Sequence, residues 1–139
     1  MSKKELIKML NQDLSAELGT IIRYNYQASK SAGPHALPLR GLLRGEIPDE
    51  LGHATFLSDV IVDMGGEPTL EPQEFKPTAN TKEMLEQDIK FELKDVVNYR
   101  QHAQAAEALD EIELKLKLEE MAADESEHAR ELGRVLRGM

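Results

Sequence analysis

Cysteine is absent from this chain of 139 residues. The protein therefore has no disulfide bond, no thiolate zinc site, no rubredoxin-type iron centre and no cysteine nucleophile. Any metal ion that it binds must be held by oxygen and nitrogen atoms.

Positive charge and long apolar runs are also scarce. Acidic residues outnumber basic ones by 26 to 17, which gives a formal net charge of −9 and removes the attraction to phosphate that favours nucleic-acid binding. Charged side chains interrupt the first ten residues, so we expect neither a signal peptide nor a membrane span. The sequence predicts a cytoplasmic protein whose partners are neither nucleic acids nor membranes.

The length suits one domain over residues 1–139, and that domain contains an internal repeat. Comparing the chain with itself at an offset of 75 residues pairs identical residues at 17 of the 56 positions from Met9 to Met64. Chance would give about four, so we interpret the match as a duplicated unit. The repeats cover about residues 2–64 and 77–139, and residues 65–79 between them are polar and contain three prolines.

Each repeat carries two stretches of apolar residues at alternating steps of three and four, the spacing of amphipathic helices. The sequence thus predicts two antiparallel helical hairpins joined by a long crossover, which makes an all-α four-helix bundle. The four stretches run from Ile7 to Ala28, Leu39 to Met64, Leu85 to Ala103 and Leu114 to Val135.

Local signals predict where these helices begin and end. Gly33–Pro34 and Gly65–Gly66 should end the first two, while Asn80–Glu83 and Asp110–Glu113 resemble capping boxes that open the last two. Pro48 lies inside the second stretch, where its ring clashes with the preceding turn. We therefore expect a kink or a new helix start at residues 46–48.

Charged residues occupy the middle of each stretch, where a core residue is expected. The first and third stretches carry one glutamate, and the second and fourth carry Glu-x-x-His. Glu17 precedes Gly33 by 16 residues and Glu50 follows Pro34 by 16, so the hairpin places them at one level. The convergent set is Glu17, Glu50, His53, Glu92, Glu125 and His128.

Four ionised carboxylates in a core would be costly unless cations neutralise them. Two divalent cations would balance four carboxylates. Oxygen-rich ligands with one imidazole per metal favour iron or manganese over structural zinc, calcium or magnesium. A plain structural bundle remains the alternative, but it leaves the buried charges unexplained. His35, in a loop, and His102, off the third stretch, are interpreted as exposed bystanders.

The motif Asp49-Glu50-Leu51-Gly52-His53, repeated as Asp124-Glu125-Ser126-Glu127-His128, resembles that of ferritin-like di-iron carboxylate proteins. The resemblance covers about residues 5–139. It implies terminal ligands Glu17 and Glu92, bridging ligands Glu50 and Glu125, and one histidine, His53 or His128, for each metal. It also implies that Asp49 and Asp124 orient the histidine of the opposite helix, the alternative being that they are ordinary surface acids.

Tyr24 and Tyr99 follow Glu17 and Glu92 by two turns on the same helix faces. Helical side chains lean toward the N-terminus, so both phenols should approach the metal layer. Each could donate a hydrogen bond to a ligand carboxylate or supply an electron, or it could simply fill the core.

Within the superfamily, the spacing is similar to that of bacterioferritin, whereas Arg23 to Lys30 is similar to rubrerythrin. Leu51 stands at the position of the usual haem-ligating methionine, so haem is not expected. The extra rubrerythrin glutamate falls near Asp95, a shorter acid. Met139 matches Met64 in the repeat, so no fifth helix is expected, and we expect a homo-oligomer, in the first place a dimer, before a storage shell.

The sequence thus predicts a di-iron oxidase, a ferroxidase that oxidises Fe(II) with dioxygen or hydrogen peroxide. Two alternatives remain: a rubrerythrin-like peroxidase that uses an external electron donor, and an iron-storage subunit of an oligomer.

Overall fold

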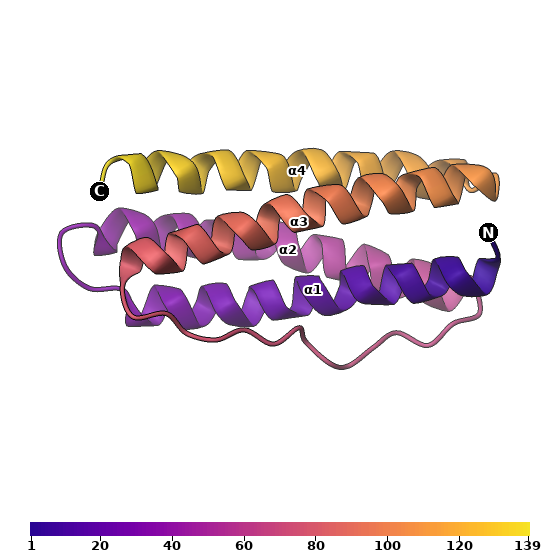
Figure 1. Cartoon of the computed structure of the whole chain (residues 1–139). Helices are drawn as coiled ribbons and strands as arrows, with labels where there is room; N and C mark the ends of the chain where they lie inside the picture. Colours follow the sequence, from indigo (N-terminus) through magenta and orange to yellow (C-terminus); the bar gives the residue numbers. More distant parts are fainter.

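The computed structural model describes all 139 residues and contains four long helices and no strand (Figure 1). The helices are α1 (Lys3–Lys30), α2 (Ala36–Asp63), α3 (Thr81–Ala108) and α4 (Ile112–Arg137). This arrangement confirms the predicted all-α four-helix bundle. None of the four helices is apolar over a length that would cross a membrane.

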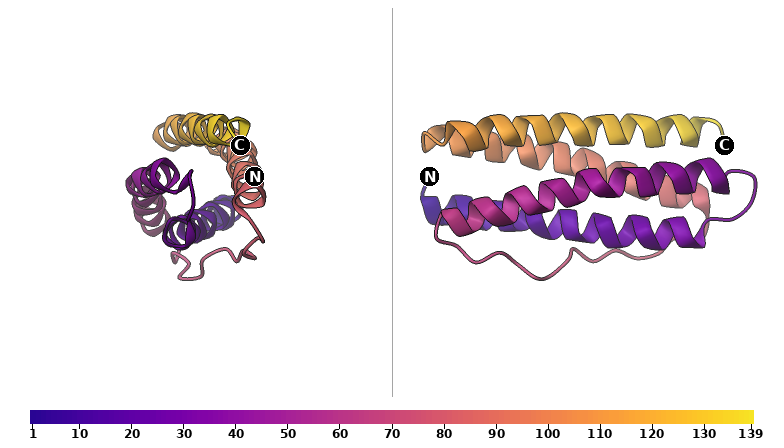
Figure 2. Two further views of the ribbon diagram at one scale, coloured as in Figure 1. Left: turned by 90° about the vertical axis from the view of Figure 1, so that its left-hand side faces the viewer. Right: turned by 180° about the vertical axis from the view of Figure 1, so that it is seen from behind.

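The bundle consists of two hairpins that lie against each other. α1 packs mainly on α2, and α3 mainly on α4, whereas the contacts of α1 with α3 and of α2 with α4 are fewer (Figure 2). The chain ends lie at opposite ends of the bundle (Figure 1). The site that the sequence predicts therefore lies where the two hairpins meet.

The crossover between α2 and α3 runs along the outside of α1 (Figure 1). The Gln73 amide donates to the Ser15 carbonyl at 2.9 Å, and the Ser15 hydroxyl donates to the Glu71 carbonyl at 2.8 Å. Gly19 allows this close approach, because a Cβ atom there would lie only 2.6 Å from the Gln73 carbonyl oxygen.

The apolar core is divided into two clusters, one toward each end of the bundle. One cluster packs the first half of α1 against the second half of α2, the second half of α3 and the first half of α4. The other joins the opposite halves, with Tyr24, Leu39, Leu85 and Leu132 among its members. Leucines of both clusters are fully buried. The middle of the bundle is left to the charged residues.

The helix starts differ in part from the predicted ones. Asn80 caps α3 as expected, since its side chain accepts a hydrogen bond from the Glu83 amide at 2.9 Å. The predicted capping box at Asp110–Glu113 is wrong: α4 begins at Ile112, and its N-cap residue Glu111 makes no side-chain capping bond. Asp110 instead has a left-handed backbone with φ of +59° and serves the turn between α3 and α4.

The sequence predicts either a kink or a new helix start at residues 46–48. The new helix start is wrong. α2 runs unbroken from Ala36 to Asp63 with Pro48 inside it. Pro48 and Arg44 both lie on the exposed side of α2, where water can hydrate the Arg44 carbonyl that loses its usual amide partner. The helix therefore carries Glu50 and His53 in a regular register.

Candidate metal centre

The structure brings together the six side chains that the repeat pointed to. Each of the four helices contributes a glutamate, and α2 and α4 each add a histidine one turn later. The four glutamates are completely buried and the two imidazoles are 6% exposed. They form two groups of potential ligand atoms, each group lying within 4.8 Å, and both groups contain Glu50 and Glu125.

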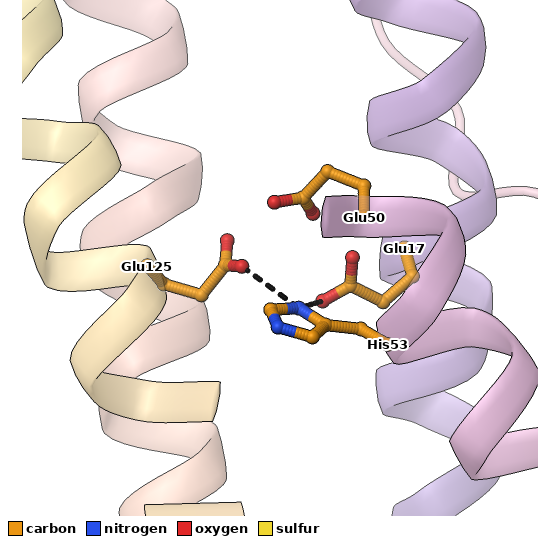
Figure 3. A group of neighbouring side chains, drawn as sticks. All are labelled: Glu17, Glu50, His53 and Glu125. Carbon is orange, nitrogen blue, oxygen red and sulfur yellow. Dashed lines mark hydrogen bonds and ion pairs between the residues drawn. The ribbon is translucent and has the colours of Figure 1, made fainter. Parts of the chain in front are cut away.

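The first group joins Glu17, Glu50 and His53 of one hairpin to Glu125 of the other (Figure 3). His53 Nδ1 lies 3.3 Å from Glu17 Oε1 and 3.1 Å from Glu125 Oε1. Figure 3 shows Glu125 reaching across from α4 toward the side chains on α1 and α2. One hairpin alone does not complete this group.

The second group joins Glu92, Glu125 and His128 of the second hairpin to Glu50 of the first. His128 Nδ1 lies 2.9 Å from Glu50 Oε1, 3.8 Å from Glu125 Oε1 and 3.9 Å from Glu92 Oε2. The two groups are thus related by the internal repeat, and Glu50 and Glu125 lie between the two histidines.

The far nitrogen of each imidazole faces an aspartate on the opposite hairpin. His53 Nε2 lies 2.9 Å from Asp124 Oδ2, and His128 Nε2 lies 3.3 Å from Asp49 Oδ2. An Nε2–H that donates to a carboxylate leaves Nδ1 with a free lone pair. Both histidines therefore can present Nδ1 to a cation among the glutamates.

The two tyrosines form hydrogen bonds across the hairpin interface. The Tyr24 hydroxyl on α1 donates to Glu92 on α3, and the Tyr99 hydroxyl on α3 donates to Glu17 on α1. Both phenols are buried, and burial raises the pKa of each well above the usual tyrosine value. Each phenol stays protonated and fixes one oxygen of a glutamate in the cluster.

Burial dominates the electrostatics of the cluster. Desolvation raises the pKa of Glu17 and of Glu50 to about 8, and raises the pKa of Glu92 and Glu125 as well. Burial by itself lowers the pKa of His128, but the neighbouring carboxylates of Glu50 and Glu46 raise it to about 10. Without a cation, the cluster thus retains protons at neutral pH.

Most buried oxygen atoms of the cluster have no hydrogen-bonding partner. Both carboxylate oxygens of Glu50 and of Glu125, one oxygen each of Glu17 and Glu92, and His128 Nδ1 lack one. Buried polar atoms in proteins are normally satisfied, so a group of orphaned atoms pointing at one another is the arrangement expected of a cation-binding site. The donor set, carboxylate oxygen with one imidazole for each group, fits iron or manganese.

A polar surface cleft of about 700 Å³ lies between α2 and α4 and leads to His53. Asp49, Asp59 and Asp124 line it together with Lys117. The negative charges of these aspartates attract cations from solvent to this edge of the centre.

Two histidine expectations need correction. His102 is not an exposed bystander: it is 5% exposed, and its Nδ1 lies 2.6 Å from Asp13 Oδ2 across the α1–α3 interface. Burial raises the pKa of Asp13, while the hydrogen bond from His102 lowers it. His35 is partly buried at the N-terminus of α2, where it makes no side-chain capping bond. Neither histidine belongs to the ligand groups.

A second buried polar cluster was not predicted from the sequence. Asp88 on α3 accepts from Arg23 Nε and from Gln27 Nε2 on α1, both at 2.9 Å. Asp13 and Asp88 are identical in the repeat, a signal that both belong to the core. Asp95 is likewise buried, 5% exposed, but it does not belong to either ligand group.

The comparisons with known proteins agree with this geometry. The family model described as a ferritin-like domain matches residues 7–139. A ferritin-like di-iron-carboxylate protein from Bacillus anthracis is 40% identical, with a TM-score of 0.94 over 98% of this chain and 99% of that one. No curated relative matches the sequence.

Two more distant structures share the fold. A dodecameric thioferritin from Bacteroides fragilis is 24% identical, with a TM-score of 0.90 over 99% of this chain and 88% of that one. The bacterioferritin of Desulfovibrio desulfuricans, whose structure shows a di-iron site, is 22% identical, with a TM-score of 0.89 over 97% and 80%. From its sequence match and its structural likeness, the chain belongs to the ferritin-like family and has the di-iron-carboxylate fold.

Proposed function

We propose that this protein binds two iron ions in its core and oxidises Fe(II) with dioxygen or hydrogen peroxide. The single observation that carries the proposal is the pair of overlapping ligand groups that share Glu50 and Glu125. In this proposal Glu17 and His53 bind one ion, Glu92 and His128 bind the other, and the two shared glutamates bridge them. Four carboxylates then balance two divalent cations.

The surrounding residues have defined tasks in this proposal. Asp124 and Asp49 hold the imidazoles with Nδ1 toward the metals, and Tyr99 and Tyr24 hold Glu17 and Glu92. The acidic cleft beside His53 supplies a route for Fe(II). Metal binding displaces the protons that the glutamates hold at neutral pH. Those protons are available when oxygen is reduced.

The reaction balances with either oxidant. Two ferrous ions each lose one electron, and one hydrogen peroxide takes both electrons and two protons to become two water molecules. With dioxygen, the same two electrons and two protons give hydrogen peroxide. The metal supplies this redox chemistry, while the chain supplies geometry and charge balance.

The buried tyrosines favour a second candidate, a peroxidase that retains its two irons. Each phenol is hydrogen-bonded to a proposed ligand, so it lies where an electron could pass to the centre. An external electron donor would then return two electrons for each hydrogen peroxide reduced to water.

The two candidates differ in the fate of the metal. We would add Fe(II) well above two per chain, first under air and then with peroxide, and follow ferric absorbance. Continued oxidation faster than that of free iron supports the ferroxidase. A halt at two irons, followed by peroxide consumption that requires a donor, supports the peroxidase.

A pair of matched variants distinguishes the loss of a proposed ligand from the loss of a surface charge. Glu50→Ala removes a shared ligand, whereas Glu127→Ala changes an exposed glutamate two residues from Glu125 on the same helix. We expect Glu50→Ala to abolish binding of two metals and Glu127→Ala to leave it intact. Metal analysis that finds only traces in the native protein would contradict both candidates.

We also propose that the chain assembles with copies of itself. Ile22 and Tyr26 on α1 and Ile47 on α2 line a shallow groove on the outer face of the first hairpin. Leu51 follows Ile47 by one turn and lies at the neighbouring cleft beside His53. Ile22 and Leu51 are more than half exposed. The related Bacteroides fragilis protein is a dodecamer. Light scattering will give the subunit number, for which a dimer is our minimal expectation, and a monomer at micromolar concentration would contradict self-association.

A further inference from the structure

Glu46 is a buried carboxylate that is not among the four glutamates proposed above as metal ligands. It lies on α2 one turn before Glu50, is 6% exposed, and its Oε2 atom has no hydrogen-bonding partner. No lysine or arginine nitrogen lies within 4 Å of its carboxylate, whereas the imidazole of His128 does, at 3.8 Å. A buried carboxylate oxygen without a hydrogen bond is costly, so the stability of the metal-free fold does not explain Glu46.

The internal repeat shows that Glu46 has no counterpart in the other half of the centre. At the offset of 75 residues the equivalent position is Met121, which is completely buried. The six proposed ligands and both supporting aspartates are identical between the repeats. The extra acid therefore distinguishes one metal position from the other.

Glu46 faces the half of the centre that contains His128. Its Oε2 lies 3.8 Å from His128 Nδ1, the nitrogen that Asp49 leaves free for a metal. Two atoms that each lie about 2.1 Å from one ion are about 3 Å apart when adjacent and about 4.2 Å apart when opposite. A single ion can therefore contact both atoms.

Charges around Glu46 agree with this placement. Burial raises the pKa of Glu46 to about 8, with His128 lowering it and Glu92, Glu50 and Asp88 raising it. Glu92, Glu50 and His128 are three of the four members of the second ligand group.

We propose that Glu46 is a further ligand to the metal bound by His128, so that the two metal positions are unequal and the position next to Glu46 binds its ion more tightly. This inference rests on the proposed two-metal function. Five carboxylates around two divalent ions leave one excess negative charge, on the His128 side. That position should therefore fill first, and it should favour hard cations that prefer oxygen ligands.

The test measures metal affinity without turnover. The native protein is titrated anaerobically with Mn(II) in a calorimeter, and we expect two binding steps of different affinity. Glu46→Met places methionine at both repeat-related positions, and it should weaken the tighter step by at least about tenfold. A Glu46→Met isotherm identical to the native one would overturn the proposal.

Variants that lack one of the two histidine ligands show which metal position loses affinity when Glu46 is replaced. With His53→Ala, the surviving strong position is the one beside His128, and adding Glu46→Met should weaken it. With His128→Ala, the surviving position is beside His53, and the same substitution should change its affinity less than twofold. Equal weakening in both backgrounds would show a general effect on the core and would contradict the assignment.

A reciprocal variant tests the role of position 121. Met121→Glu combined with Glu46→Met should make the metal position beside His53 the one with the higher affinity. Titrations of this double variant in the His53→Ala and His128→Ala backgrounds will identify that position. Should Glu46→Met fail to fold, Glu46→Gln keeps the size and removes the charge. Two equal native sites would overturn this inference and leave the proposed function standing, whereas a native protein that binds no Mn(II) and no Fe(II) would overturn both.

Discussion

Asp124 and Asp49 hold the two imidazoles from outside, but with different geometry. Asp124 Oδ2 lies 2.9 Å from His53 Nε2, and its side chain is 41% exposed. Asp49 Oδ2 lies 3.3 Å from His128 Nε2, and its side chain is 62% exposed. The shorter and drier contact should be the stronger one.

Asp124→Ala is therefore expected to weaken the affinity of the centre for Mn(II) by about 10- to 100-fold, and Asp49→Ala by less. Asp59→Ala is the matched control, because Asp59 lines the same cleft but contacts neither imidazole. Calorimetric titration gives the affinities. Equal losses for Asp124→Ala and Asp59→Ala would show that only the charge of the cleft matters.

Tyr99→Phe keeps the buried ring and removes the hydrogen bond to Glu17. We expect the free energy of unfolding to fall by about 1–3 kcal/mol, because a buried carboxylate loses its donor. Tyr26, whose side chain is 39% exposed, is the control, and Tyr26→Phe should change stability by less than about 0.5 kcal/mol. Urea unfolding of the metal-free variants measures both values, and two metals should still bind to each.

The sequence was sufficient to predict the six candidate ligands, because the repeat doubled each signal. It was insufficient for Glu46 and His102, which have Met121 and Gln27 at the repeat-related positions. Where the two halves carry different residues, the comparison of the repeats cannot support a functional role for either one. The helical spacing does place Glu46 on the inner face of its helix, whereas the burial of His102 became visible only once the helices were packed.

Among the elements, the crossover depends on one glycine of α1. Gly19→Ala should lower the free energy of unfolding by about 1–3 kcal/mol, because the new methyl group would collide with the Gln73 carbonyl. Gly45→Ala is the control: it is also helical, no atom lies within 4 Å of its Cβ position, and it should stabilise by up to about 1 kcal/mol. Thermal unfolding compares the two, and equal shifts would contradict the close packing.

Helix positions and most helix ends were predictable from the sequence, because apolar periodicity, Asn80 and the glycine pairs set them, but two local features were not. Asp110–Glu113 has the pattern of a capping box, but the tight turn after α3 uses Asp110 in a left-handed conformation. Pro48 has the signal of a helix break, but α2 stays continuous because its buried face packs both before and after Pro48, from Leu39 to Ile61. Tertiary contacts decide both cases.

For the whole molecule, the raised pKa values predict how the metal-free protein responds to pH. Glu17 and Glu50 titrate near 4.5 when unfolded and at about 8 when folded. Between these pH values the folded state binds more protons than the unfolded state, so the free energy of unfolding should fall as pH rises from about 5 to 8. Below about 4.5 this loss is absent.

Melting curves at several pH values, with and without Mn(II), test this dependence. The metal should raise the melting temperature most at pH 8, where the metal-free cluster is least stable. Glu50→Ala should flatten the metal-free pH profile, because it removes one buried acid, and it should abolish most of the metal effect. A metal-free native protein whose stability rises between pH 5 and 8 would contradict the assignment.

The crossed bonds between Tyr24 and Glu92 and between Tyr99 and Glu17 are related by the internal repeat, so the molecule resembles a two-fold dimer of hairpins fused into one chain. In a dimer of identical subunits, every substitution appears twice and must suit both copies. Covalent fusion removes this constraint, so one half can gain Glu46 or His102 while the other keeps Met121 or Gln27. The long crossover is therefore what allows two halves of the same architecture to specialise around a shared centre.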